Sequence, residues 1–226
     1  MPEVRYLKIQ FGQNLFPYEV PKFRGAVIEK IQRVSDLFHN HQGDNKFIYR
    51  YPLVQYKVSN KKAGIVCLND GTDDIHYLLQ VPDLTLRIGA ETRDFVIEDV
   101  DLRYHHVQVC QTELEYSILN WQALNQKSYA RYRELEDDQS AQIDLLESNL
   151  RGHILAFAKG IGWWVEQPIY VRISSLKNIK LLPYKKQRIL TFSLHFKTNV
   201  SLPDYIGLGK GASVGFGVLR RVKERG

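Results

Sequence analysis

The spacing of apolar positions predicts strands and helices that alternate along the first hundred residues. Polar and apolar residues alternate over 4–11, which is typical of a half-buried strand. Apolar residues then recur at helical spacing over 24–38, and a shorter helix is predicted over 70–80. The predicted strands of this half are 4–11, 46–58, 63–68, 85–88 and 95–97. The order strand, helix, strand, strand, helix, strand is the βαββαβ pattern of the ferredoxin-like fold.

The second half repeats this order with insertions. A strand-like run is followed by a polar helix, then by a longer amphipathic helix and two further strands. The ranges are 104–115 (strand), about 127–136 (helix), about 141–159 (helix), 169–173 (strand) and 189–196 (strand). A basic segment, LKNIKLLPYKKQR, separates the last two strands. We predict an α+β chain of tandem ferredoxin-like domains, 1–100 and 101–226, with a C-terminal glycine-rich loop.

That loop lies within SLPDYIGLGKGASVGFGVLRRV, residues 201–222. Glycines leave backbone N–H groups bare and close to an approaching anion, and a lysine among them favours phosphate. A mobile hairpin or a tight bend is the structural alternative. The spacing fits neither the dinucleotide fingerprint nor the P-loop. The predicted anion-binding residues of the loop are Gly207, Gly209, Lys210, Gly211, Ser213, Gly215 and Gly217.

The distribution of charge points to a polyanionic partner. Residues 1–100 carry 13 basic and 13 acidic side chains, whereas residues 151–226 carry 14 basic and three acidic ones. This excess of +11 favours a nucleic acid, although a solubilising surface, an acidic protein or a membrane surface would also fit it. The basic candidates between the last two strands are Lys177, Lys180, Lys185, Lys186 and Arg188.

Composition narrows the class of protein further. Two cysteines are too few for a disulfide framework or a zinc site, so we expect a reducing cytoplasm. No apolar run is long enough for a bilayer span, and the start lacks a signal-peptide core, so no membrane association is expected. Trp163 and Trp164 could stack on bases, but their position just after a helix favours the core.

Five segments, taken in order, resemble one family. They are FHNH, YRYPLVQYK, WQALNQKSYARY, LRGHILAFAKGIGW and GLGKGASVGFG. With a glycine-rich loop ending in G-F-G on tandem ferredoxin-like units, the chain resembles the RAMP superfamily of CRISPR-associated RNA-binding proteins. Within it, the likeness is to the endoribonuclease that processes precursor CRISPR RNA. The resemblance implies CRISPR repeat RNA as partner, other CRISPR-associated proteins as further partners, and a monomer or homodimer.

The implied chemistry assigns roles to His39, His41, Lys30 and Tyr49. RNA supplies its own 2′-hydroxyl nucleophile, so the enzyme moves two protons and stabilises charge on phosphate, with no metal or cofactor. Histidine suits both transfers, and in an extended segment His39 and His41 would point to one side. Lys30, near a whole number of helical turns before His41, would stabilise charge, and the family-like Tyr49 would position the nucleophile or donate a proton.

The same residues also fit other roles. The two histidines could be surface residues or metal ligands, and Tyr51 shares a strand with Tyr49, so either could face the site. The histidine that serves as the acid is not assigned. A non-catalytic RAMP-type subunit that binds guide RNA within an effector complex is the alternative function.

Overall fold

A computed structural model of the protein describes residues 2–31, 51–184 and 187–222. The chain divides into an N-terminal unit, residues 3–105 with 213–215, and a C-terminal unit, residues 1–2, 106–212 and 216–226. The sequence placed this division near residue 100. Among the described residues, no helix is long and apolar enough to cross a membrane.

The N-terminal unit has the ferredoxin-like strand order. Its described elements are β1 (Glu3–Asn14), α1 (Val20–Ile31), β2 (Val54–Ser59), β3 (Lys62–Leu68), α2 (Asp70–Leu79), β4 (Thr85–Ile88), β5 (Glu91–Asp94) and β6 (Ile97–His106). The described strands form a sheet in the order β2-β3-β1-β6, in which β3 pairs antiparallel with both β1 and β2. The strands β4 and β5 pair only with each other in this part of the chain, as a hairpin inserted before the last strand.

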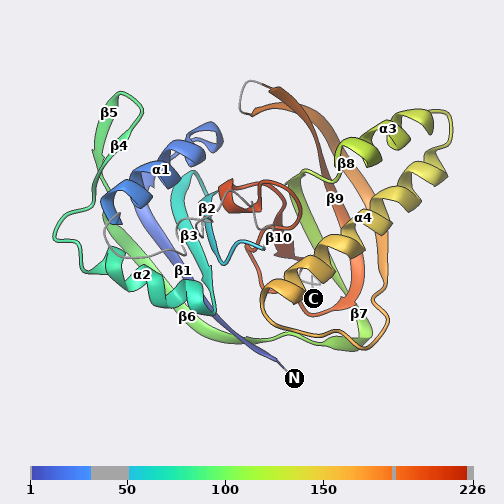
Figure 1. Cartoon of the computed structure of the whole chain (residues 1–226), viewed down its shortest axis with the longest axis horizontal. Helices are drawn as coiled ribbons and strands as arrows, with labels where there is room; N and C mark the ends of the chain where they lie inside the picture. The colour runs from blue at the N-terminus through green and yellow to red at the C-terminus, as the bar shows by residue number, and fades with distance from the viewer. Residues whose placement is uncertain (1, 32–50, 185–186, 223–226) are drawn as a thin grey trace, which may run out of the picture. The chain divides into compact units, whose positions relative to one another are not determined.

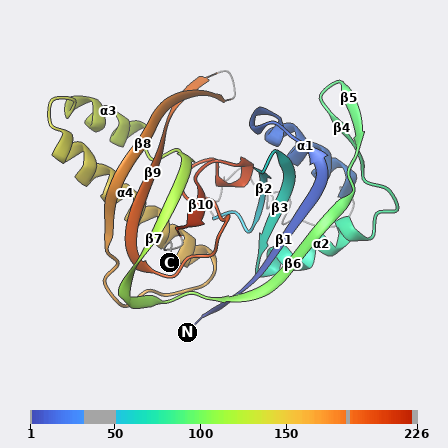
Figure 2. The ribbon, with the colours of Figure 1, turned by 180° about the vertical axis from the view of Figure 1, so that it is seen from behind.

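Both helices of this unit cover one face of its sheet (Figures 1 and 2). Aromatic rings form the core between α1 and the sheet. Phe23 of α1 meets Phe11 of β1 and Tyr56 of β2 edge-on, each at 5.7 Å between ring centroids. Side chains alternate along a strand, so Lys57, next to Tyr56 in β2, points to the opposite face. Lys57 is nevertheless only 3% exposed.

The C-terminal unit repeats the order with one replacement. Its described elements are β7 (Val109–Trp121), α3 (Gln126–Glu134), α4 (Gln139–Gly160), β8 (Val171–Tyr184), β9 (Gln187–Val200), the short 3-10 turn η2 (Ala212–Val214) and β10 (Val218–Arg221). The sheet order β10-β7-β9-β8 matches that of the N-terminal unit, strand for strand. Residues 201–217, which hold the glycine-rich segment, take the place of the second helix between β9 and β10. The α+β fold of tandem ferredoxin-like units is therefore confirmed.

Several predicted boundaries were wrong. The basic segment between the predicted strands 169–173 and 189–196 belongs mostly to β8, which pairs with β9 from Val171 to Tyr184. The strand-like run 104–115 spans parts of β6 and β7, and the last strand of the N-terminal unit is β6 rather than 95–97. The first helix begins at Val20, earlier than the periodicity indicates, and residues 32–50 lie outside the described residues.

Candidate nucleic-acid interface

The glycine-rich segment, residues 207–217, folds back on itself and, apart from residues 213–215, belongs to the C-terminal unit. Gly209, Gly211, Gly215 and Gly217 all have positive φ angles. At Gly217, with φ of +62°, a Cβ atom would lie 2.0 Å from the carbonyl oxygen of Leu208, so no other residue fits without a backbone shift. The segment is thus a set of tight bends, as one of the alternatives supposed.

Hydrogen bonds correct the expectation of bare backbone N–H groups. The Leu208 N–H donates to Gly217 O at 2.9 Å, the Phe216 N–H to Gly211 O at 3.2 Å, and the Gly217 N–H to Asn120 O at 3.3 Å. Isolated bridges pair Gly207 with Val218 and Lys210 with Gln122. Because these donors are already bonded inside the protein, an anion must use the other N–H groups of the segment or its side chains.

The Lys210 side chain of this segment is exposed, and Ser213, in η2, is half-buried. Ser213 and Gly215 belong to the three residues grouped with the N-terminal unit.

The β8–β9 hairpin carries the other predicted RNA-binding residues. Lys177, Lys180 and Arg188 are exposed, whereas Lys185 and Lys186 lie outside the described residues. Lys180 pairs with Thr191, and Arg188 pairs with Pro183, an odd number of positions from Lys180 along β8. Lys180 and Arg188 therefore point to opposite faces of the hairpin.

The end of the hairpin reaches the glycine-rich segment. The Tyr184 ring meets the Phe216 ring edge-on, with 5.4 Å between centroids. The structure therefore brings together, within the C-terminal unit, the β8–β9 hairpin and the glycine-rich segment, which the sequence predicted separately as RNA-binding elements.

Beneath the segment lies a pair of residues to which the sequence analysis gave no role, Trp121 and His153. The Trp121 Nε1–H donates to His153 Nδ1 at 3.1 Å, which fixes the neutral ring with its proton on Nε2. Burial, together with the positive charge of Lys210, lowers the pKa of His153 to about 4. A Cβ atom on Gly209 would lie 2.8 Å from Trp121 Nε1, so the backbone of the segment rests directly on this indole. Both residues lie in segments that carry the family resemblance, WQALNQKSYARY and LRGHILAFAKGIGW, but the sequence does not pair them, because they are 32 positions apart.

Gln122 adds a buried amide next to the same segment. Its side chain is 4% exposed, and its Nε2 atom has no hydrogen-bond partner among the described residues. That atom would lie 2.8 Å from a Cβ at Gly211. The Nε2 donor of Gln122 therefore lies next to the glycine-rich segment.

In the N-terminal unit, only one predicted catalytic residue can be placed. His39, His41 and Tyr49 lie outside the described residues. Lys30 occupies the last turn of α1, and its Nζ donates to Asp83 Oδ1 at 2.8 Å. This hydrogen bond lowers the pKa of Asp83. Tyr51 accepts a hydrogen bond from Gln55 Nε2 at 2.9 Å, and burial raises the pKa of Tyr51.

The expectation that both tryptophans belong to the core was wrong for Trp164. Trp163 is half-buried, but the Trp164 side chain is 84% exposed. The Trp163 N–H donates to Ala158 O at 2.8 Å and so ends α4. This closure turns the next residue outward.

Comparisons with known proteins agree with this architecture over nearly the whole chain. A crystal structure of Cas6b is similar at a TM-score of 0.88 with 27% identity, covering 98% of this chain and 100% of that one. A second one, described as the CRISPR RNA processing endoribonuclease Cas6b, has a TM-score of 0.74 and 24% identity, covering 98% and 100%. An uncharacterised protein of Methanocaldococcus jannaschii is 29% identical over 148 residues, which are 65% of this chain and 97% of that protein. Residues 2–107 match the model of the Cas6b N-terminal domain, and residues 108–222 match that of the Cas6b C-terminal domain. The resemblance to CRISPR RNA processing proteins is confirmed: the chain belongs to the Cas6b family.

Proposed function

We propose that this protein binds CRISPR repeat RNA and cleaves precursor CRISPR RNA. One observation carries the proposal: both halves match Cas6b domain models, and a Cas6b crystal structure is similar over 98% of the chain. A shared fold alone would not support a shared activity, because ferredoxin-like units serve many functions. Family membership over both domains is the stronger ground.

The proposed reaction is a metal-independent transesterification. The 2′-oxygen loses its proton to a general base and forms a bond to the adjacent phosphorus, while the bond from phosphorus to the 5′-oxygen breaks. A general acid protonates the departing 5′-oxygen. The products are a 2′,3′-cyclic phosphate and a 5′-hydroxyl, so atoms and charge balance without a co-reactant.

His39 and His41 are proposed as the acid–base pair, Tyr49 as the positioning group and Lys30 as the stabiliser of phosphate charge. The structure adds one condition to this scheme. Lys30 donates to Asp83, so it must exchange that carboxylate for a phosphate oxygen when RNA binds. The exchange is inexpensive because Asp83 is 63% exposed and solvent-exposed ion pairs are weak.

The C-terminal unit is proposed to hold the RNA backbone. The glycine-rich segment and the exposed Lys177, Lys180 and Arg188 would contact phosphates, together with Lys185 and Lys186, which lie outside the described residues. The ring contact between Tyr184 and Phe216 supports this division of labour, because it joins the hairpin to the segment.

Incubation of the purified protein with its cognate repeat RNA in EDTA tests the proposal. We expect cutting at one position, with cyclic phosphate and 5′-hydroxyl ends, and no cutting when the nucleotide before the cut carries 2′-deoxyribose. The variant with His39→Ala and His41→Ala should bind this RNA but leave it intact. Undiminished cutting of the deoxy substrate would refute the mechanism. Binding by the wild type without any cutting would favour the non-catalytic guide-RNA-binding role.

A further inference from the structure

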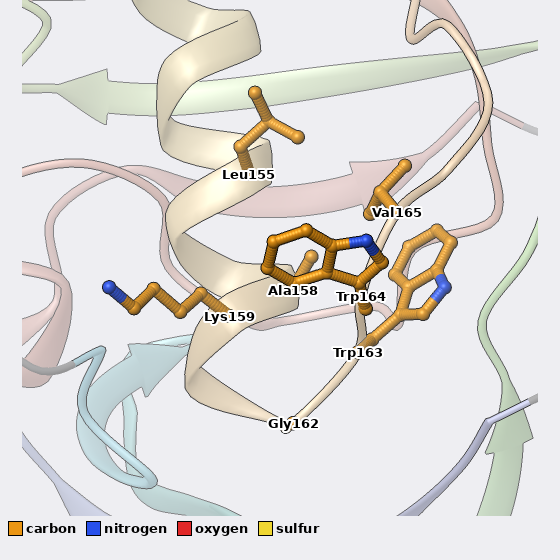
Figure 3. Close-up of a pocket in the computed structure, with 7 residues that line it drawn as sticks. All are labelled: Leu155, Ala158, Lys159, Gly162, Trp163, Trp164 and Val165. Atoms are coloured by element: carbon orange, nitrogen blue, oxygen red, sulfur yellow. The ribbon is translucent and has the colours of Figure 1, made fainter.

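Trp164 is the most exposed large hydrophobic side chain among the described residues, at 84%. Figure 3 shows its ring after the end of α4, next to Ala158, with Leu155 and Lys159 projecting from the same helix. These residues line a cavity of about 430 Å³. The exposed indole and the cavity beside it together offer a flat apolar face on which a planar ligand can stack.

A second cavity, of about 400 Å³, opens beside the same indole. It is lined by Trp163 and Trp164 together with Gln108, Glu166 and Gln167. Both cavities lie within the C-terminal unit. Trp164 therefore has an aliphatic and cationic surface in one cavity and polar side chains in the other.

We propose that this surface, the Trp164 subsite (Gln108, Lys159, Trp164, Glu166 and Gln167), binds an unpaired nucleobase of the RNA. The base stacks on the Trp164 indole, as bases do on aromatic platforms in proteins that bind single strands. The amides of Gln108 and Gln167 and the carboxylate of Glu166 offer donors and acceptors to its edge. Lys159 attracts the adjoining phosphate.

Charge favours RNA over a protein as the occupant. Residues 151–226, which supply every subsite residue except Gln108, carry 14 basic and three acidic side chains. Lys159 and Glu166 balance each other inside the subsite, so the attraction for an RNA backbone comes from the excess of positive charge in the rest of this stretch. A purely apolar partner would not explain a lysine in one cavity and three polar side chains in the other. The Trp164 subsite rests on the proposed function, because its ligand is part of the same RNA. It narrows the substrate to RNA that has an unpaired nucleotide away from the cleavage site.

The test compares two hexamers of equal charge, hexa-adenylate and an abasic ribose-phosphate hexamer, in binding titrations with the full chain. For the wild type, we expect hexa-adenylate to bind more tightly and to quench tryptophan emission. Trp164→Ala should weaken hexa-adenylate about 5-fold or more and leave the abasic hexamer unchanged. Trp164→Phe should keep most of the affinity, since its ring still stacks. Lys159→Gln should weaken both hexamers and reduce the salt slope by about one phosphate contact.

Tyr104→Ala is the matched control. Tyr104 is 64% exposed in β6 of the other unit, so its removal should change neither affinity. An equal loss for both hexamers with Trp164→Ala would overturn the subsite. So would unchanged binding of hexa-adenylate, including the case where Trp164→Ala instead dissociates a dimer in sedimentation. Cleavage of repeat RNA by the wild type, measured in parallel, separates these failures from a failure of the proposed function.

Discussion

Lys57 provides the sharpest test of the fold energetics. Its side chain is 3% exposed, and its Nζ has no hydrogen-bond partner among the described residues. Burial lowers the pKa of Lys57 from 10.5 to about 7. At pH 7, Lys57 is protonated in the unfolded chain but only about half protonated in the folded chain. The lowered pKa therefore reduces the free energy of unfolding by about 4 kcal/mol. Lys57→Met keeps the apolar stem and removes the charge, so it should raise the free energy of unfolding by about 1–4 kcal/mol.

The gain should depend on pH in a defined direction. Between pH 7 and 10.5 the unfolded state binds more protons than the folded state, so wild-type stability rises with pH relative to the variant. The advantage of Lys57→Met at pH 7 should therefore shrink by about 2 kcal/mol at pH 9. Urea denaturation followed by far-UV circular dichroism measures both values. The three tryptophans all lie in the C-terminal unit, so their fluorescence monitors that unit separately.

Lys22→Met is the control for this comparison. Lys22 is exposed on α1, so the substitution should change stability by less than about 0.5 kcal/mol at either pH. A Lys57→Met variant that is less stable than the wild type at pH 7 would refute the reasoning. A difference that does not vary between pH 7 and pH 9 would refute it equally, because it would mean that Lys57 stays protonated in the folded state.

Three further predictions concern the candidate interface. Gly217→Ala should lower the melting temperature by several degrees, since its Cβ would meet Leu208 O at 2.0 Å, whereas Gly152→Ala, with nothing within 4 Å, should raise it slightly. The folded state disfavours protonation of His153, so the free energy of unfolding of the wild type should fall by about 3 kcal/mol relative to His153→Gln between pH 6.5 and pH 4. Urea titrations at each pH measure both values. The same pH dependence in the wild type and the variant would contradict this. In single-turnover cleavage, Lys30→Gln should slow the rate about 10- to 100-fold, whereas Asp83→Asn should leave both rate and melting temperature unchanged; equal rates for Lys30→Gln and the wild type would remove Lys30 from the mechanism.

The sequence predicted the fold well where hydrophobic periodicity matches burial on one face. It failed in β8, an edge strand whose exposed Leu176, Ile179 and Leu181 obscure the alternation. It also failed at Trp164, because size and hydrophobicity indicate the core while the end of α4 turns this residue outward. The pairing of Trp121 with His153 depends on tertiary contact alone, and local patterns carry no record of it.

The glycine-rich segment shows why composition alone misjudged the backbone donors. In the N-terminal unit, a helix between the third and fourth sheet strands closes its own hydrogen bonds. In the C-terminal unit, the segment that replaces this helix closes them against itself and against Asn120 of β7. Such closure requires tight bends with positive φ, which is what glycine supplies. The glycines therefore allow the segment to pack closely on Trp121 and, at Gly217, against its own Leu208. The capacity to bind an anion depends on exposed side chains such as Lys210 and on the remaining N–H groups. Lys210→Gln should accordingly weaken RNA binding and lessen its salt dependence without lowering the melting temperature. The main effect of Gly217→Ala should instead be a lower melting temperature.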